Sequence, residues 1–217
     1  MKRILLVAAT EFEIEPTLRF LEKWHSYKKN TYILEHIQVT TCITKAGMVN
    51  TAFELGQFKG DDIDLAINAG VAGTFDVFKI GEVVNVMKDC FSELGAENDT
   101  AFLSIDEIGL GQQKREIKNL FLSKSTDALA RASGITVNTV HGNEESIQKI
   151  VERYHPDVES MEGAAFIHAA NAFNWKAIQL RSISNRVEKR NRDYWNLPLA
   201  IQNLNKVLLD LLNELNH

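Results

Sequence analysis

The chain has 217 residues, of which 45% are hydrophobic and 24% are charged, and this balance excludes disordered and fibrous classes of protein. One α/β domain can fill this length, so we expect a single domain over residues 1–217. The formal net charge of −5 argues against nucleic acid or an anionic membrane as a partner, because binding to either needs clustered positive charge.

The cysteine content and the N-terminal residues indicate a protein of the cytoplasm. The 2 cysteines, Cys42 and Cys90, can form at most one disulfide and have no spacing that would hold a metal ion. The apolar run over residues 4–9 is too short for the core of a signal peptide. No stretch approaches the roughly 18–20 apolar residues of a membrane helix.

The hydrophobic pattern predicts strands that alternate with helices. Residues 3–9 form a continuous apolar run, which is typical of a strand buried on both faces of a sheet. After it we expect, in chain order, helical spacing from Ile14 to Trp24, a hairpin within 27–44, a helix over 49–59, strands over 63–69, 82–87 and 135–140, a helix over 144–153, a short strand over 158–160, a helix over 161–173, a strand over 177–183 and a helix over 197–215. Residues 92–125 carry no clear pattern, and a loop that covers a site is one interpretation of them. The alternation implies an α/β fold whose partly parallel sheet has helices on both faces.

Polar residues cluster where four of these strands end. Ligands of such sheets bind beyond the carboxyl ends of the strands, so chemistry is expected at these ends. The four stretches cover residues 10–13, 68–73, 159–163 and 182–186.

Glu13 follows the first strand. A carboxylate there can take a proton from water if burial raises its pKa. Alternatively, Glu11, Glu13 and Glu15 only complement the dipole at the start of a helix. The spacing alone favours this second interpretation.

The stretch 68–73 (NAGVAG) contains two closely spaced glycines. Glycines let backbone N–H groups approach a ligand because no Cβ is in the way. The pattern matches neither the dinucleotide fingerprint nor the Walker loop. A tight turn, in which Gly70 and Gly73 end the buried strand, is at least as good an interpretation.

Glu162 lies between a short strand and a helix rich in small residues, within 158–165 (VESMEGAA). An ionised carboxylate can accept hydrogen bonds from both hydroxyls of a vicinal diol. The same pattern fits a helix N-cap at Ser160 followed by an acidic first turn equally well.

Arg181 and Asn185 flank residues 182–184 at the end of another strand. Strand alternation places them on one face together with Ile183. The alternatives are a buried pair of the arginine with a carboxylate and a turn formed by the asparagine. The histidines have no spacing that suggests a metal site, and we interpret them as surface or core residues.

These stretches together resemble a known family. Residues 10–13 (TEFE), 45–48 (KAGM), 68–73, 158–162 and 181–185 (RSISN) occur in the order and spacing of the purine nucleoside phosphorylase/nucleosidase superfamily. The match spans nearly the whole chain. Residues 159–166 and 184–193 resemble the futalosine hydrolases within the nucleosidase branch. The resemblance implies a three-layer α/β sandwich, with helices around a mixed, largely parallel sheet, and cleavage of a purine N-glycosidic bond.

The resemblance also implies a role for each matching residue. Glu13 would activate water, while Glu162 would hold the ribose hydroxyls and face the positive charge that develops on the sugar. Arg181 would orient Glu162, and Asn185 would recognise the base. No cofactor or metal is implied, and relatives commonly form homo-oligomers, dimers or larger. The other substrate contacts would come from Met48, Val71, Ala72, Gly73, Met161 and Ser184.

Two departures from the superfamily pattern bear on the reaction. Phosphorylases carry an arginine and a serine where this chain has Asn68 and Val71, so the phosphate cradle lacks its cation and its hydroxyl. Water is therefore the expected nucleophile. Methylthioadenosine nucleosidases have an aspartate where this chain has Asn185. An amide can donate to purine N7 and to a 6-oxo oxygen, which favours a hypoxanthine-like base over adenine.

The implied activity is hydrolysis of futalosine to hypoxanthine and dehypoxanthinyl futalosine, a step of menaquinone biosynthesis. Lys189, Arg190 and Arg192 form a basic cluster, and one of them would meet the carboxylated arm of this nucleoside. A solvated loop explains the cluster equally well. The alternative functions are a methylthioadenosine-type nucleosidase, an inosine hydrolase and a catalytically silent sensor of purine nucleosides.

Overall fold

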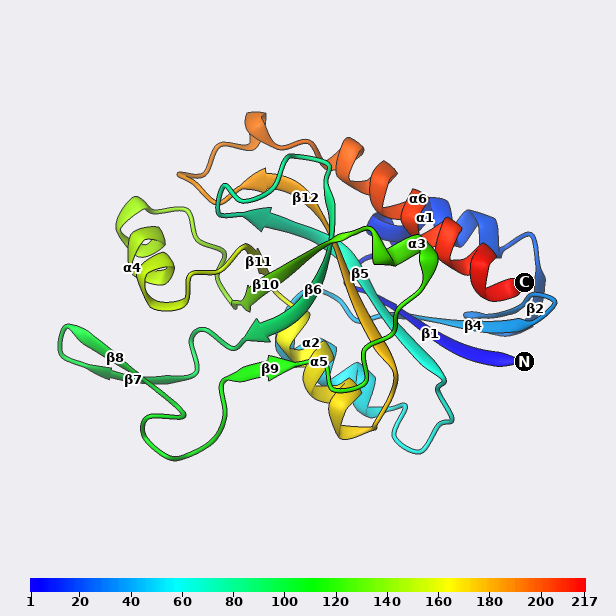
Figure 1. The fold of residues 1–217 in the computed structure, drawn as a ribbon, viewed down its shortest axis with the longest axis horizontal. Helices are drawn as coiled ribbons and strands as arrows, with labels where there is room; N and C mark the ends of the chain where they lie inside the picture. The colour runs from blue at the N-terminus through cyan, green and yellow to red at the C-terminus, as the bar shows by residue number, and fades with distance from the viewer.

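The computed structural model describes residues 1–217 and contains a mixed β-sheet with helices on both faces (Figure 1). Its strands are β1 (Lys2–Ala8), β2 (His25–Lys28), β3 (Thr31–Ile33), β4 (Ile37–Ile43), β5 (Leu65–Thr74), β6 (Val83–Cys90), β7 (Gly95–Asn98), β8 (Ala101–Ser104), β9 (Lys114–Glu116), β10 (Ala130–Thr136), β11 (Val158–Ser160) and β12 (Ala177–Arg186). Its helices are α1 (Glu11–Leu21), α2 (Met48–Gly56), α3 (Lys124–Asp127), α4 (Glu144–Tyr154), α5 (Gly163–Ala172) and α6 (Leu197–Asn216), with a short 3-10 helix η1 (Arg192–Tyr194).

Part of the sheet closes on itself. The strand order is β11-β10-β6-β12-β5-β1-β4-β3-β2, and β11 also pairs with β5. The five strands β5, β12, β6, β10 and β11 therefore form a ring. Parallel pairs join β5 to β1 and β12, and antiparallel pairs join β11 to β5 and β12 to β6. The central strand β5 is thus hydrogen-bonded to three neighbours along its length.

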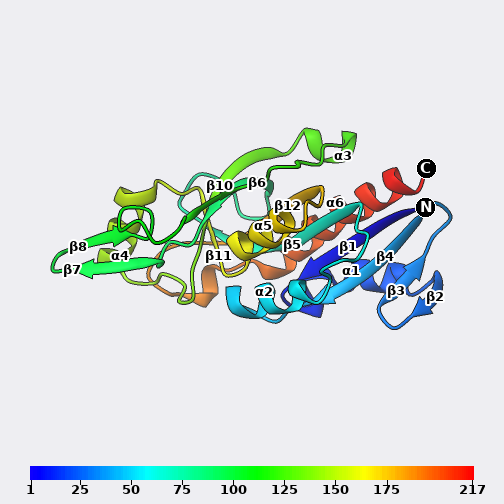
Figure 2. The same ribbon diagram turned by 90° about the horizontal axis from the view of Figure 1, so that it is seen from below.

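Apolar side chains of the strands pack against helices on each face. The side chains of β1 alternate, so that Ile4 and Leu6 face one core and Leu5 and Val7 face the other. The first core contains α1 and the apolar stripe of α6, and the second contains α2 and α5. Figure 2 shows α2 and α5 crossing the sheet on one side, with α6 on the other. The continuous run of residues 3–9 is apolar because its strand is covered on both faces.

The elements follow the predicted order, with differences near two glycines and near residue 135. We predicted that Gly70 and Gly73 end the strand, but β5 continues through both to Thr74. Backbone pairing with β12 and β11 holds these residues in the ladder, so the turn interpretation is wrong. The strand expected over 135–140 is β10, which ends at Thr136. The following residues leave the sheet and run to α4.

Residues 92–125 form short elements rather than one loop. The hairpin of β7 and β8 pairs only with itself and extends from the body at the end opposite the two termini (Figures 1 and 2). After it, β9 pairs with β6.

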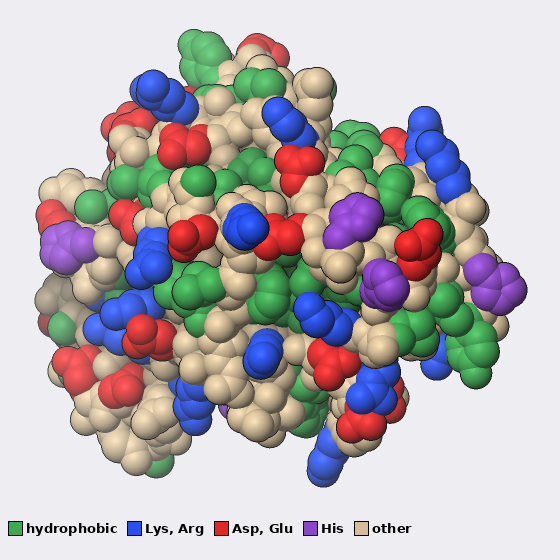
Figure 3. Space-filling view, turned by 45° about the vertical axis from the view of Figure 1, so that its right-hand side comes forward, with side chains coloured by type: hydrophobic (Ala, Val, Ile, Leu, Met, Phe, Trp, Pro, Cys, Tyr) green, Lys and Arg blue, Asp and Glu red, His purple; other side chains and the backbone are tan.

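No helix in the molecule has both the length and the apolar character needed to cross a membrane. Figure 3 shows basic and acidic side chains interspersed over the face that it presents.

Candidate active site

Glu13 lies in the first turn of α1, directly beyond the end of β1. Its Oε2 accepts hydrogen bonds from the backbone N–H and the hydroxyl of Thr10, both at 3.0 Å, which closes the start of the helix. Its Oε1 accepts from the backbone N–H of Val71 on β5 at 3.1 Å. Glu13 is therefore a helix-start residue and also a half-buried carboxylate against β5, so the two interpretations of this position are compatible.

Gly70 makes room for the Glu13 carboxylate. A Cβ atom at residue 70 would lie 2.9 Å from Oε1 of Glu13 and 3.5 Å from Nη1 of Arg181. Such a contact would force the carboxylate to move. The glycine thus serves a close approach of side chains to a strand rather than a turn.

Glu162 is the residue before α5, but its carboxylate makes no capping hydrogen bond to its own helix. Instead, Oε1 accepts from the backbone N–H of Gly47, in the segment that leads into α2, at 3.0 Å. Only 9% of Glu162 is exposed. The interpretation with Ser160 as the N-cap is wrong, because Ser160 is the last residue of β11 and the helix begins at Gly163.

A buried polar cluster fixes the start of α5 from behind. The hydroxyl of Thr136 accepts from the backbone N–H of Ala164 at 2.7 Å and donates to Oδ1 of Asp89 at 2.8 Å. Gln179 donates to Oδ2 of Asp89 at 2.9 Å. A Cβ atom at Gly163 would lie 2.0 Å from this Oδ2, so only glycine fits there. These contacts set the position from which Glu162 projects, and burial raises the pKa of Asp89.

Arg181 is 1% exposed, and its partner is an amide rather than a carboxylate. Its Nη2 donates to Oδ1 of Asn68 at 2.5 Å, and its Nη1 donates to the backbone carbonyl of Leu180 at 3.1 Å. Its Nε is buried without a partner. We expected Arg181 to orient Glu162, but no hydrogen bond joins the two residues. The backbone of Gly47 holds Glu162, and Arg181 acts on it through charge.

The groups around Glu162 shift its pKa in opposite directions. Burial raises the pKa of Glu162 above its ordinary value, and this effect outweighs the lowering by the charge of Arg181 and by the hydrogen bond from Gly47. The charge of Glu13 raises the pKa further, which places the two carboxylates within interaction range of each other. Two acids and one buried cation therefore share this end of β5.

Asn185 lies at the other end of the same stretch of β5. The register of β12 shifts between Ile183 and Asn185, so simple alternation does not extend from Arg181 to Asn185 as predicted. Oδ1 of Asn185 accepts from the Ser184 hydroxyl at 2.7 Å, and Nδ2 donates to the backbone carbonyl of Arg186 at 2.8 Å. A Cβ atom at Gly73 would lie 3.2 Å from this Nδ2.

The other predicted site residues fall into two groups. Met48, Val71 and Met161 are partly exposed and lie next to the groups that hold the carboxylates. Ala72 and Ser184 are buried, and the side chain of Ala72 packs in an apolar cluster of the strand ring. Ser184 donates to the Ala72 carbonyl at 3.3 Å as well as to Asn185. Any substrate contact from Ala72 would therefore come from its backbone, and the Ser184 hydroxyl holds Asn185.

Two residues that the sequence did not mark as site residues, His141 and Trp195, line a cavity of about 60 Å³ together with Asn185, Glu159 and Arg190. We interpreted His141 as a surface or core residue, but it is paired with Glu159 beside Asn185. The guanidinium of Arg190 lies over the Trp195 ring, 5.3 Å from its centre, so the basic cluster makes a cation–π contact with an aromatic residue. A tryptophan five residues beyond an arginine in a polar segment was the available signal.

Three comparisons of sequence agree with one another. A family model described as the phosphorylase superfamily matches residues 3–213. A futalosine hydrolase of Thermus thermophilus is 28% identical over 179 residues, which cover 79% of this chain and 80% of that protein. A futalosine hydrolase of Acidothermus cellulolyticus is 31% identical over 148 residues, which cover 64% of this chain and 61% of that protein.

Solved structures match the fold over almost its whole length. A mutant 5′-methylthioadenosine/S-adenosylhomocysteine nucleosidase of Helicobacter pylori, with 5′-methylthioadenosine in its active site, has a TM-score of 0.81 and 16% identity, with 99% of both chains covered. The native futalosine hydrolase of Helicobacter pylori has a TM-score of 0.80 and 17% identity, with 98% of both chains covered. The predicted α/β fold class, with helices around a mixed sheet, is confirmed.

Proposed function

The chain belongs to the phosphorylase superfamily, and we propose that it is a nucleosidase that hydrolyses the N-glycosidic bond of futalosine. The observation that carries this proposal is the arrangement along β5. Glu13 and Glu162 lie at one end of residues 70–73, and the carboxamide of Asn185 lies at the other. Such a stretch can hold the sugar of a nucleoside at the acids and its base at the amide.

Glu13 and Glu162 have different roles in the proposed hydrolysis. Glu13 accepts a proton from water, whose oxygen bonds to the anomeric carbon as the C–N bond to the base breaks; the base leaves with the electron pair of that bond and takes up a proton from solvent to become neutral hypoxanthine. Glu162 accepts hydrogen bonds from the ribose hydroxyls, and its negative charge faces the oxocarbenium ion that forms on the sugar. Because that positive charge is greatest in the transition state, the carboxylate stabilises it more than the neutral nucleoside.

The strand that carries the site favours water over phosphate. Phosphorylases of the superfamily use an arginine and a serine at the positions of Asn68 and Val71. Here the Asn68 amide is taken by Arg181 at 2.5 Å, and Val71 offers only a hydrocarbon side chain beside its backbone N–H, which is bonded to Glu13. No free cation or hydroxyl from these two positions can hold phosphate.

Asn185 supports a 6-oxopurine as the leaving base. Its Oδ1 accepts from the Ser184 hydroxyl and one N–H of its Nδ2 donates to the Arg186 carbonyl, so the second N–H of the amide is left to face a base. This remaining N–H can be shared between N7 and the 6-oxo oxygen of hypoxanthine, which are both acceptors, whereas the 6-amino group of adenine would place a donor against this donor. The same argument applies to inosine.

We expect Asn185→Asp to lower kcat/KM for futalosine by about 10- to 100-fold, because a buried polar mismatch costs this much discrimination. Initial rates of hypoxanthine release measure the effect. Asn98→Asp, at an exposed residue of β7, is the matched control and should leave the rate unaltered. Unchanged kinetics of Asn185→Asp would show that the base is recognised elsewhere.

The surroundings of Arg190 support a role for the basic cluster in binding the carboxylated arm of futalosine. Arg190 lines the small cavity beside Asn185 and also a larger open groove between α4 and residues 187–194, which Lys189 lines as well. Arg192 lies 6.0 Å from the Trp195 ring centre. The aromatic ring and the cation together supply an apolar wall and a charge, as an aromatic carboxylate requires.

The pH dependence follows from the raised pKa of Glu162. The reaction needs this carboxylate ionised, so kcat/KM should rise as the pH increases through its pKa. Since burial raises that pKa, the acidic limb should lie above the ordinary glutamate value of 4.5. A profile of kcat/KM from pH 4 to 8 tests this. A limb at or below 4.5 would contradict the assignment of Glu162 as the ionised group.

The experiment that tests the function is a base-release assay on futalosine, inosine and methylthioadenosine, with and without phosphate. We expect hypoxanthine from futalosine at a rate independent of phosphate, with a free sugar as the second product. Faster release of adenine from methylthioadenosine would assign the alternative nucleosidase activity, and equal use of inosine would assign an inosine hydrolase. Binding without release would assign a sensor.

Exposed apolar side chains beside the site support a homo-oligomer. Phe12 next to Glu13, and Val49 and Phe53 on α2, are 61%, 74% and 66% exposed. They lie on helices that begin where the adjacent strands β1 and β4 end. We propose that a second copy of the chain covers them, as exposed apolar patches commonly mark such contacts.

The two cysteines are free, which fits the reducing cytoplasm in which we place the enzyme.

A further inference from the structure

His141 and Glu159 form a closed pair beside the proposed base site. One carboxylate oxygen of Glu159 accepts from the backbone N–H of His141 at 2.9 Å, and the other is hydrogen-bonded to Nδ1 of the same histidine. Glu159 is 5% exposed and has no other side-chain partner. All the hydrogen bonding of this buried carboxylate is therefore directed to one residue.

The pair fixes the chemical character of the histidine ring. A carboxylate can only accept, so Nδ1 carries the proton that it receives. In the neutral ring this leaves Nε2 as an acceptor. No group of the protein hydrogen-bonds Nε2, and the ring lines the same small cavity as Asn185. The cavity thus has an amide donor at one residue and a ring acceptor at the other.

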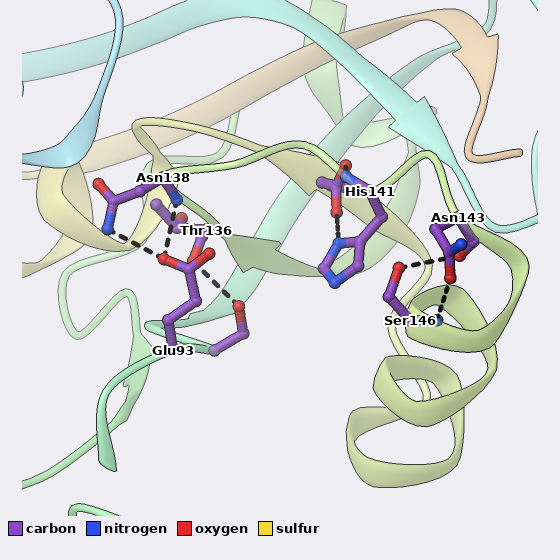
Figure 4. A network of polar contacts seen from close by, with 8 residues as sticks. Glu93, Thr136, Asn138, His141, Asn143 and Ser146 are labelled. Atoms are coloured by element: carbon purple, nitrogen blue, oxygen red, sulfur yellow. Dashed lines mark hydrogen bonds and ion pairs between the residues drawn. The ribbon is translucent and has the colours of Figure 1, made fainter. Parts of the chain in front are cut away.

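The segment that carries His141 is held on both sides of it. Before it, the backbone and side chain of Asn138 donate to Oε2 of Glu93 at 3.0 and 2.9 Å. After it, Oδ1 of Asn143 accepts from the backbone N–H of Ser146 at the start of α4, at 3.1 Å. Figure 4 shows these contacts along the connection between β10 and α4. A recognition group on a segment fixed in this way needs little ordering when a ligand binds.

We propose that His141, oriented by Glu159, is a specificity-determining residue that accepts a hydrogen bond from N1–H of a 6-oxopurine. The proposal rests on the proposed nucleosidase function and adds a second reader of the base. Hypoxanthine carries a proton on N1, and adenine presents a lone pair there, so an acceptor at Nε2 favours the first and repels the second. Asn185, at N7 and the 6-oxo oxygen, and His141, at N1–H, then contact neighbouring groups on either side of C6 of the base.

The test compares futalosine with its 6-amino counterpart as substrates. His141→Phe keeps a ring of similar size but removes Nε2, and should lower the ratio of kcat/KM for the 6-oxo over the 6-amino substrate by about 10- to 100-fold. His141→Gln restores an acceptor and should recover part of the ratio. Glu159→Gln lets an amide donate to Nδ1, which makes Nε2 a donor, and should also lower the ratio.

Asn138→Ala is the matched control, because it removes the side-chain hydrogen bond to Glu93 from the same segment without touching the cavity. It should leave the ratio unchanged, and thermal melting checks that each variant is folded. A ratio within twofold of the wild-type value in folded His141→Phe and Glu159→Gln would overturn the proposal. So would a change of equal size in Asn138→Ala.

Binding of free hypoxanthine and free adenine, measured by calorimetry, separates this proposal from the function on which it rests. If the wild type releases no base from any nucleoside yet prefers hypoxanthine, and His141→Phe loses that preference, the nucleosidase assignment fails and the role of His141 stands. If the wild type is active but the preference for hypoxanthine is the same in His141→Phe, the role of His141 fails alone. Binding of neither base by an inactive wild type would overturn both.

Discussion

Replacing Glu162 with glutamine should lower kcat for futalosine by about 10²- to 10³-fold, which is the usual cost of removing one preorganised charge partner of a transition state. The amide keeps the size of the side chain and can still accept from the backbone N–H of Gly47. It cannot supply the negative charge that faces the sugar cation. Steady-state rates of hypoxanthine release measure the loss.

The same substitution should not destabilise the fold at neutral pH. The folded state raises the pKa of Glu162, so folding favours the protonated carboxyl, and this contribution is lost as the pH rises through the raised pKa. A neutral glutamine removes that dependence. Melting temperatures at pH 7 should be equal to or above the wild-type value, while Glu116→Gln, at an exposed residue of β9, should change neither rate nor melting temperature. Full activity of Glu162→Gln would remove this residue from the mechanism.

Replacing Glu13 with glutamine should lower kcat by about 10²- to 10⁴-fold, the range for the loss of a general base. An amide cannot take the proton of the attacking water. The matched control is Glu15→Gln on the same helix, because Glu15 is exposed and pairs only with Arg19 at 2.7 Å. It should retain wild-type turnover. Equal losses in the two variants would mean that the effect comes from the helix start and not from catalysis.

Gly70→Ala gives a graded version of this test, because it displaces the Glu13 carboxylate without removing it. The added Cβ would lie 2.9 Å from Oε1, at the flexible end of the side chain. The fold should therefore survive, and turnover should fall between the wild type and Glu13→Gln, since a shift of about 1 Å can cost about 10²-fold in rate. Wild-type turnover in Gly70→Ala would show that the position of this carboxylate is not critical.

The sequence predicts the elements of this fold better than the contacts between them. The strand over residues 3–9 could be predicted because a strand buried on both faces of a sheet has a continuous run of apolar residues. The extension of β5 through Gly70 and Gly73 was not predictable, because it depends on pairing with strands that follow much later in the chain. Local glycine content favours a turn, and the neighbouring strands override that preference.

The candidate site shows the same division. The acids Glu13 and Glu162 stand out because each follows a predicted strand. The contacts around these acids could not be predicted from the sequence. The backbone of Gly47 donates to Glu162, 115 positions away, and the nearby Arg181 donates to Asn68, 113 positions away. Glu159 and His141 are 18 positions apart, and nothing in the intervening sequence marks them as partners. Such pairs arise from the three-dimensional course of the chain.

The closed ring of strands fixes the distance along β5 between the proposed catalytic carboxylates and the residue proposed to recognise the base. Val71 donates to Glu13, the proposed general base, and Gly73 adjoins Asn185, the proposed base-recognition residue. The two positions are two residues apart on a strand bonded to its neighbours, a span of about 7 Å. An insertion or deletion there would shift every later pairing of the ring. We therefore expect that replacing side chains around the base can change the nucleobase preference of this chain, while the distance from the base to the bond that is cleaved stays constant.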